Sequence, residues 1–207
     1  MRFLAAISGF GAFEKVLENP SGALARRLAE QAPDGWDVRA RELPVSFRRG
    51  PTAFDELLAG MDRAPDLLFA MGVHKKPGFR IERIARGAPV GKPGRSDNDG
   101  DAVDDLAAEP GDFASDLPVE RFAEQLGERL GVEAFVSEDA GGYVCERVYH
   151  RVLSRAAERT IPGLFLHVPP LKFTDLEGQE RALRELFALL REELSLRARA
   201  RGESRPS

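Results

Sequence analysis

The chain has 207 residues, 43% of them hydrophobic, and a formal net charge of −4. That length and apolar content allow one domain with a sizeable core, and the acidic balance gives no general attraction for nucleic acid or anionic membranes. A single cysteine excludes an intrachain disulfide framework and favours a reducing compartment.

No targeting or membrane segment is expected. The apolar start over residues 1–8 is too short for a signal peptide, and no stretch reaches the roughly eighteen apolar residues of a membrane span. We therefore expect a cytoplasmic protein without a membrane or nucleic-acid partner.

The first half of the chain alternates strand-like and helix-like segments. Short apolar or alternating runs predict strands at residues 2–8, 36–43, 65–72 and 79–85. Asn19-Pro20-Ser21 provides the start of a helix that follows a Gly-Phe-Gly turn, and residues 54–61 predict a second helix.

The second half begins with a stretch of different character. Residues 87–116 are crowded with Gly, Pro and Asp and predict a long loop, disordered in part. Apolar periodicity then predicts helices at 118–130, from Cys145 onward and at 176–196, and strands at 133–137 and 164–167.

Together these elements predict a single-domain α/β/α sandwich, with a mostly parallel twisted sheet and helices on both faces. We expect the domain to cover residues 1–196. Residues 197–207, rich in arginine and ending in polar residues, are expected to form a flexible C-terminal tail.

The most informative residue is Cys145, at a glycine turn that leads into a helix. A helix N-terminus carries partial positive charge, which stabilises a thiolate. His167 closes an apolar strand, where open α/β sheets place their sites. The alternative for each residue is a structural one, a small buried thiol or a satisfied histidine, but their joint occurrence suggests thiol catalysis.

No metal or other cofactor is expected. His74, His150 and His167 lie in unrelated segments and form no ligand spacing with the cysteine. His150 is expected at the surface, on another face of the Cys145 helix.

Several motifs in fixed order carry a family resemblance. They are Gly9-Phe10-Gly11-Ala12-Phe13, Asn19-Pro20-Ser21, Glu82-Arg83-Ile84-Ala85, Asp139-Ala140-Gly141-Gly142-Tyr143-Val144-Cys145 and Phe165-Leu166-His167-Val168-Pro169. From residue 1 to about residue 190 the chain resembles pyroglutamyl peptidase I, a family of cysteine-type omega peptidases that remove an N-terminal pyroglutamate. The resemblance implies pyroglutamyl peptides as substrates and a homotetramer.

The resemblance also implies residue roles: Cys145 as nucleophile, His167 as its base and Glu82 as the group that orients the imidazole. On sequence alone, Glu82 would be a solvated carboxylate on a strand. Attack on the pyroglutamyl carbonyl would give an acyl-enzyme, and His167 would protonate the departing amine.

For the substrate, the resemblance implies a pocket that includes Phe10, Phe13, Asn19 and Val73. The two phenylalanines could sandwich the flat, neutral lactam or could simply be core. Asn19 is interpreted mainly as a helix cap that secondarily braces the pocket. Arg86, Lys92 and Arg95 remain alternatives for a basic group that assists the N–H donors of the Cys145 helix at the oxyanion.

The chain departs from the family pattern near the pocket. Glu14-Lys15 replaces two glycines, His74-Lys75-Lys76-Pro77 adds bulk and positive charge, and Glu146 puts a carboxylate directly after the nucleophile. Two alternatives therefore stay open beside the pyroglutamyl peptidase: a non-catalytic relative that binds through the same cleft, and an amidase for another small acyl or lactam group.

Overall fold

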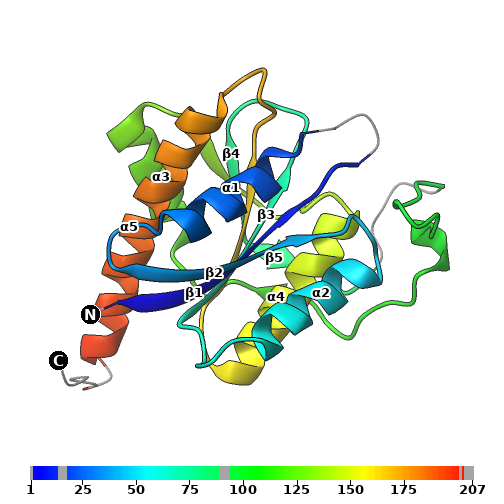
Figure 1. The fold of residues 1–207 in the computed structure, drawn as a ribbon, viewed down its shortest axis with the longest axis horizontal. Coiled ribbons are helices and arrows are strands. Elements are labelled where there is room, and N and C mark those ends of the chain that lie inside the picture. The colour runs from blue at the N-terminus through cyan, green and yellow to red at the C-terminus, as the bar shows by residue number, and fades with distance from the viewer. Residues whose placement is uncertain (1, 14–17, 89–93, 201, 203–207) are drawn as a thin grey trace.

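The computed structural model describes residues 2–13, 18–88, 94–200 and 202 (Figure 1). The strands are β1 (Phe3–Phe10), β2 (Trp36–Leu43), β3 (Leu67–Val73), β4 (Phe79–Glu82), β5 (Ile84–Ala85), β6 (Phe113–Ala114), β7 (Ala134–Ser137) and β8 (Gly163–Val168). The helices are α1 (Pro20–Glu30), α2 (Arg49–Ala59), α3 (Val119–Leu130), α4 (Val144–Arg159) and α5 (Leu176–Ala200), with a short 3₁₀ helix η1 (Val103–Asp105).

Six strands form one sheet in the order β2-β1-β3-β8-β4-β7. Strands β1, β2, β3 and β8 run parallel, β4 is antiparallel to β8, and β7 pairs parallel with β4. Strands β5 and β6 pair in a separate two-stranded sheet. The predicted α/β class with a mostly parallel sheet is confirmed.

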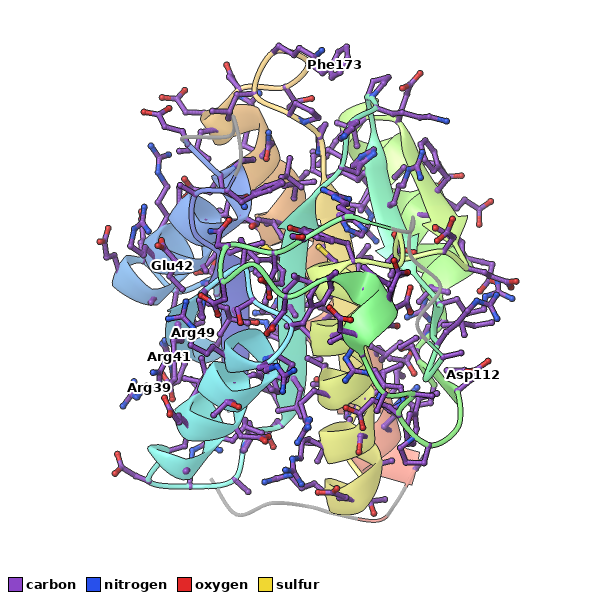
Figure 2. All side chains as sticks on the ribbon, turned by 90° about the vertical axis from the view of Figure 1, so that its right-hand side faces the viewer. Arg39, Arg41, Glu42, Arg49, Asp112 and Phe173 are labelled. Carbon is purple, nitrogen blue, oxygen red and sulfur yellow. The ribbon has the colours of Figure 1, made fainter. Side chains whose placement is uncertain are left out.

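Helices cover both faces of the sheet, as Figure 1 shows. Helices α1, α3 and α5 pack on one face and α2 and α4 on the other, because alternate residues of each central strand belong to two different buried clusters. Many charged side chains lie outside these layers, and Figure 2 shows Arg39, Arg41, Glu42 and Arg49 along the side of β2 and α2.

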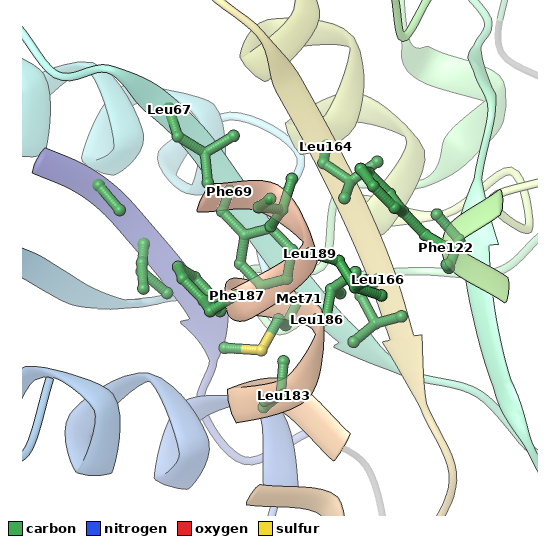
Figure 3. Close-up of a cluster of buried hydrophobic side chains, with 14 of the residues drawn as sticks. Leu67, Phe69, Met71, Phe122, Leu164, Leu166, Leu183, Leu186, Phe187 and Leu189 are labelled. Carbon is green, nitrogen blue, oxygen red and sulfur yellow. The ribbon is translucent and has the colours of Figure 1, made fainter. Parts of the chain in front are cut away.

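The larger core lies under α5. Figure 3 shows Phe69 and Met71 of β3 facing Leu186 and Phe187 of this helix. The rings of Phe69 and Phe187 meet edge to face with centroids 5.2 Å apart, a favourable arrangement for two aromatic quadrupoles. The fully buried Trp36 donates its indole N–H to the Phe187 carbonyl at 3.0 Å, so no polar atom of that ring is left unpaired.

Two helix boundaries differ from the sequence-based expectation. Helix α2 begins at Arg49, before the expected start at Phe54, because Pro51 lies in the first turn, where its missing N–H costs no hydrogen bond. Helix α5 continues to Ala200, past the expected end at residue 196. Within this added turn, Arg197 bonds to Glu193 one turn earlier at 2.8 Å and also to Asp116.

The region around the predicted fourth strand and the long loop is also divided more finely than expected. The expected strand at 79–85 breaks at Arg83, whose N–H donates to the Ser137 carbonyl at 2.7 Å. Residues 94–116 contain η1 and β6, and the buried Asp97 carboxylate accepts the Phe47 N–H at 2.7 Å. Residues 89–93 of that predicted loop and most of the predicted tail (201 and 203–207) lie outside the described residues.

His150 is a correction to the sequence analysis, which places it at the surface. It is 4% exposed, its Nε2 lies 2.9 Å from the Gly111 carbonyl, and its ring packs against Phe113. The short β6 segment covers this side of α4, which helical spacing alone does not reveal.

The topology brings several strand ends to one edge of the sheet. Parallel strands β1, β3 and β8 end there, and the antiparallel β4 begins there, so that Arg80 pairs with His167. Ligand sites of open α/β sheets lie at this edge. Within the described residues, no helix combines the length and apolar character needed to cross a bilayer.

Candidate active site

Cys145 is the second residue of α4 and is half-buried. The chain reaches it through Gly141 and Gly142, both at positive φ (91° and 55°), a backbone conformation that glycine adopts without strain. The N-cap residue Tyr143 makes no side-chain hydrogen bond to the first turn. The sulfur therefore sits at the positive end of the helix dipole.

His167 lies on β8, is only 6% exposed, and has its ring beside the Cys145 sulfur. Gly72 of β3 is its neighbour in the sheet. A Cβ atom at Gly72 would stand 2.8 Å from the Cys145 Sγ and 3.2 Å from the His167 Cδ2. Only a glycine on the central strand thus leaves space for the sulfur beside the ring.

Glu82 completes a line of three side chains. It is fully buried, and its Oε1 lies 2.7 Å from the Nδ1 of His167. Because Glu82 holds Nδ1, Nε2 is the ring nitrogen left for the Cys145 sulfur. The structure thus brings Cys145, His167 and Glu82 together from α4, β8 and β4.

The electrostatics of this line favour a protonated imidazole. Burial of the His167 ring lowers its pKa, but the hydrogen bonds and charges of Cys145 and Glu82 outweigh burial and raise the pKa to about 9. At neutral pH the imidazole is therefore protonated, which is the state that can pair with a thiolate nucleophile.

Tyr149, in the next turn of α4, holds the backbone of Glu82. Its hydroxyl donates a 2.6 Å hydrogen bond to the backbone carbonyl of Glu82. Burial, followed by the charges of Glu82 and Glu146, raises the pKa of Tyr149 well above its usual 10. The hydroxyl therefore stays a donor over the whole working range of pH, and it ties β4 to the nucleophile helix.

Glu146, the carboxylate directly after the nucleophile, has hydrogen-bond partners of its own. The side chain is 3% exposed, and its Oε1 accepts the Arg86 N–H at 2.7 Å. Burial raises its pKa, hydrogen bonds from the Arg86 and Gly142 backbone lower it, and the charges of Glu82 and Asp139 raise it again, with a net upward shift. The effect of burial on the Glu146 carboxylate thus outweighs the hydrogen bonds that it accepts.

A cleft of about 680 Å³ opens beside Cys145 and His167. All four residues expected to bind substrate line it: Phe10, Phe13, Asn19 and Val73. Phe10 is buried and Phe13 half-buried, so both offer ring surface to the cleft while remaining attached to the core. A volume of this size holds a small molecule or a few residues of a peptide.

Asn19 performs two tasks at the cleft wall. Its Oδ1 accepts the N–H and the hydroxyl of Ser21 at 3.2 and 2.8 Å, which caps α1. Its Nδ2 donates to the Gly11 carbonyl at 3.0 Å, which fixes the turn after β1. One side chain thus joins the helix start to the segment that carries Phe10 and Phe13.

The basic residues considered as stabilisers of the oxyanion differ in their position relative to the cleft. Arg95 lines the cleft, with its guanidinium carbon 3.6 Å from the centroid of the Tyr143 ring. Arg86 instead bonds to the Glu138 carbonyl at 3.3 Å and pairs with Asp112. Lys92 lies outside the described residues.

The altered segments of the sequence also reach the cleft. His74 and Lys75 line it, and the His74 Nε2–H donates to the Gly78 carbonyl at 2.8 Å while its Nδ1 accepts the Lys76 N–H. Burial first, then the positive charges of His167, Arg80 and Lys76, lower the pKa of His74 to about 4 against that carbonyl bond. His74 is therefore neutral. Glu14 and Lys15 lie outside the described residues.

Sequence reasoning missed three residues of this site. Gly72 gave no signal, because its role is the space it leaves. Tyr143 also lines the cleft, with its hydroxyl 2.9 Å from the Ser96 carbonyl. Arg80 could have been found, since it lies two residues before Glu82 and thus on the same face of a strand.

Comparison with known proteins agrees with this geometry. Residues 3–180 match the protein family described as pyroglutamyl peptidase. The chain belongs to the pyroglutamyl peptidase family. Relatives include pyrrolidone-carboxylate peptidase 1 of Ralstonia nicotianae, 32% identical over 80% of this chain and 77% of the relative. Pyrrolidone-carboxylate peptidase of Chromobacterium violaceum is 33% identical over 79% of this chain and 76% of the relative.

Solved structures share the fold of this pyroglutamyl peptidase family member. A mutant pyrrolidone carboxyl peptidase from Pyrococcus furiosus superposes with a TM-score of 0.82 at 25% identity, covering 92% of this chain and 99% of that one. Pyroglutamyl peptidase I from Bacillus amyloliquefaciens gives a TM-score of 0.77 at 22% identity, over 90% and 93% of the two chains, which supports the fold alone.

Proposed function

We propose that this protein is a cysteine peptidase that removes an N-terminal pyroglutamate from peptides. The observation that best supports this proposal is the arrangement of Cys145, His167 and Glu82. They lie beside a cleft lined by Phe10 and Phe13, in a chain of the pyroglutamyl peptidase family. Its relatives carry the name pyrrolidone-carboxylate peptidase, which is that activity.

Acylation uses the charge arrangement of the site. The Cys145 thiolate attacks the pyroglutamyl carbonyl carbon, and the carbonyl oxygen becomes an oxyanion. Val144 and Cys145 line the cleft at the helix start, so N–H groups of that turn are the donors for the oxyanion. Arg95 is a basic side chain of the same cleft that can assist them. The His167 imidazolium then protonates the leaving nitrogen as the C–N bond breaks, which releases the shortened peptide and leaves a thioester.

Deacylation reverses the role of His167. The imidazole, now neutral, takes a proton from water, and the resulting hydroxide attacks the thioester carbon. Collapse expels the Cys145 thiolate and frees pyroglutamate, and His167 is again the imidazolium. Glu82 holds Nδ1 throughout, which keeps Nε2 directed at the reacting atoms.

The lining of the cleft suits the binding of a neutral, planar acyl group. Phe10 and Phe13 provide aromatic surface for the lactam ring, and aromatic faces bind a flat amide without the desolvation cost that a charged amino terminus would incur. Asn19 and Val73 line the same cleft, Asn19 as the brace of the wall and Val73 at the end of β3.

Hydrolysis of a fluorogenic pyroglutamyl amide under reducing conditions tests the proposal. The wild type should release the fluorophore, and iodoacetamide should abolish release by alkylating the only cysteine. Cys145→Ala should lose the activity while its circular dichroism stays unchanged. Arg39→Gln, a change on an exposed position of β2, should remain as active as the wild type.

Two results would contradict the proposal in different ways. A folded wild type that leaves pyroglutamyl amides intact would refute the substrate, and cleavage of another acyl amide in the same assay would then favour the amidase alternative. Hydrolysis that survives Cys145→Ala would refute the mechanism.

The cytoplasmic location and the homotetramer are part of this proposal as well. The single cysteine supports a reducing compartment. The homotetramer rests on family resemblance alone, and light scattering of the purified chain would measure its assembly directly.

A further inference from the structure

The cleft is basic although the whole chain is acidic. Its charged lining comprises four basic side chains, Lys75, Arg80, Arg95 and Lys172, against the acidic Glu18 and Asp139. The chain as a whole has a net charge of −4. A basic cleft in an acidic protein attracts a negatively charged ligand.

Arg80 is the most informative of these side chains. It pairs with His167 across the β4–β8 ladder and lines the cleft. Its Nε is buried without a hydrogen-bond partner among the described residues, and its guanidinium carbon lies 5.6 Å from the centroid of the Phe135 ring.

Arg80 differs from two nearby arginines in its ion pairing. Arg83 forms an ion pair with Glu138 and Arg86 with Asp112. Within the described residues, Arg80 has no carboxylate at ion-pair distance, although it is half-buried beside the reacting atoms. A guanidinium in that position is ready to accept an anion from outside the chain.

Two lysines line the cleft together with Arg80. The described lysines, Lys75, Lys76 and Lys172, all lie in the loops that follow β3 and β8, and all are exposed. Two of them, Lys75 and Lys172, line the cleft. The loop after β8 also exposes Phe173, which Figure 2 shows at the outer end of the molecule, far from Arg39.

Strand order divides the cleft into two sides. Phe10 ends β1 and Phe13 follows it, on one side of the β3–β8 pair that carries Gly72 and His167. Arg80 on β4 lies on the other side of β8. When the acyl group lies against the phenylalanines with its carbonyl at Cys145, the leaving amino acid extends toward β4 and the loop after β8.

We propose that Arg80, Lys75 and Lys172 form a subsite for a carboxylate on the amino acid that follows pyroglutamate. This inference rests on the proposed peptidase activity and specifies its substrate class: pyroglutamyl peptides with an acidic second residue, or pyroglutamyl dipeptides with a free carboxyl terminus. Both sources offer the same carboxylate chemistry to the guanidinium and ammonium groups.

The test compares two carboxyl-amidated peptides that differ by one group: pyroglutamyl-Glu-Ala-amide and pyroglutamyl-Gln-Ala-amide. Because side-chain shape is matched, the ratio of their kcat/KM values reports charge alone. Partly exposed ion pairs support a preference of about fivefold for the Glu peptide at low ionic strength. Salt should reduce the preference, since it screens charges beyond about 8 Å at physiological strength.

Variants assign the preference to the subsite. Arg80→Gln should bring the ratio close to one, and Lys172→Glu should lower it. Lys75→Glu gives a second exposed substitution in case Arg80→Gln folds poorly. Arg39→Gln, which removes an exposed charge from β2, should leave the ratio unchanged.

A second pair of substrates separates the two carboxylate sources. Pyroglutamyl-Ala with a free carboxyl terminus is compared with its amide, and a larger ratio here than for Glu over Gln assigns the subsite to the terminal carboxylate. Efficient hydrolysis of the Gln peptide with both ratios near one, or ratios unaffected by all three variants, would overturn the subsite. That result would leave the peptidase proposal intact, whereas failure to cleave any of these peptides would refute the peptidase itself.

Discussion

The substitution Gly72→Ala is the most direct probe of how the fold places the nucleophile. A methyl group at this position would stand 2.8 Å from the Cys145 Sγ, 3.1 Å from the Phe165 Cζ and 3.2 Å from the His167 Cδ2. Ordinary van der Waals contacts begin near 3.4 Å. The sulfur must therefore move by about 0.6 Å or more, and the ring beside it must shift as well.

The cost should appear in catalysis more than in stability. The Cys145 sulfur can rotate away from the methyl group, which relieves the closest contact without unfolding the core. Overpacking of a well-packed interior costs about 1–3 kcal/mol of folding stability. We expect Gly72→Ala to lose about 1 kcal/mol or less. A misplacement approaching 1 Å at a reacting atom costs roughly a hundredfold in rate, so kcat should fall by about that factor.

A matched glycine offers the control. Gly163 begins β8, the strand that carries His167. A methyl group there would stand 2.9 Å from the Leu153 Cδ2 and 3.0 Å from the Ala156 Cβ. Gly163→Ala should therefore lower the midpoint of urea unfolding yet keep kcat near wild type. Both variants are assayed with the fluorogenic pyroglutamyl amide. Gly72→Ala with wild-type kcat would refute the idea that this glycine is kept for the sulfur.

Two further predictions concern the other members of the line. Glu82→Gln preserves side-chain size but removes the charge at the His167 Nδ1, so kcat should fall at least about a hundredfold with unchanged circular dichroism. A value within threefold of wild type would exclude an orienting role. In Cys145→Ala, His167 loses one of the two partners that oppose burial, so its pKa, about 9 in the wild type, should decrease. The imidazole NMR titration should move to lower pH, and an unchanged midpoint would contradict the pairing.

The fold follows from the sequence where local patterns decide the structure. The strand predicted at 36–43 matches β2, and helix α3 begins within one residue of its predicted start at 118. Apolar periodicity is strong in both segments. The early start of α2 was missed because Gly50 and Pro51 usually end helices, yet in a first turn neither costs a hydrogen bond.

The candidate site was predictable only in part, because its parts differ in physical origin. Cys145 carried a signal of its own, a thiol at a glycine turn into a helix. Glu82 was recognised through family resemblance alone, since a strand carboxylate is ordinarily solvated and its burial depends on β8 and α4 packing around it. The space at Gly72 depends on three elements that are distant in sequence, so no local pattern could report it.

The reversed direction of β4 has a consequence for folding fidelity. This strand has only four residues, and its pairing sets Arg80 opposite His167 and Glu82 opposite Phe165. A slip of one residue would turn both charged side chains into the apolar layer beneath α3 and α5, and a slip of two would exchange which of them faces the imidazole. Catalytic activity of this protein therefore also indicates that β4 has paired with β8 in the correct register.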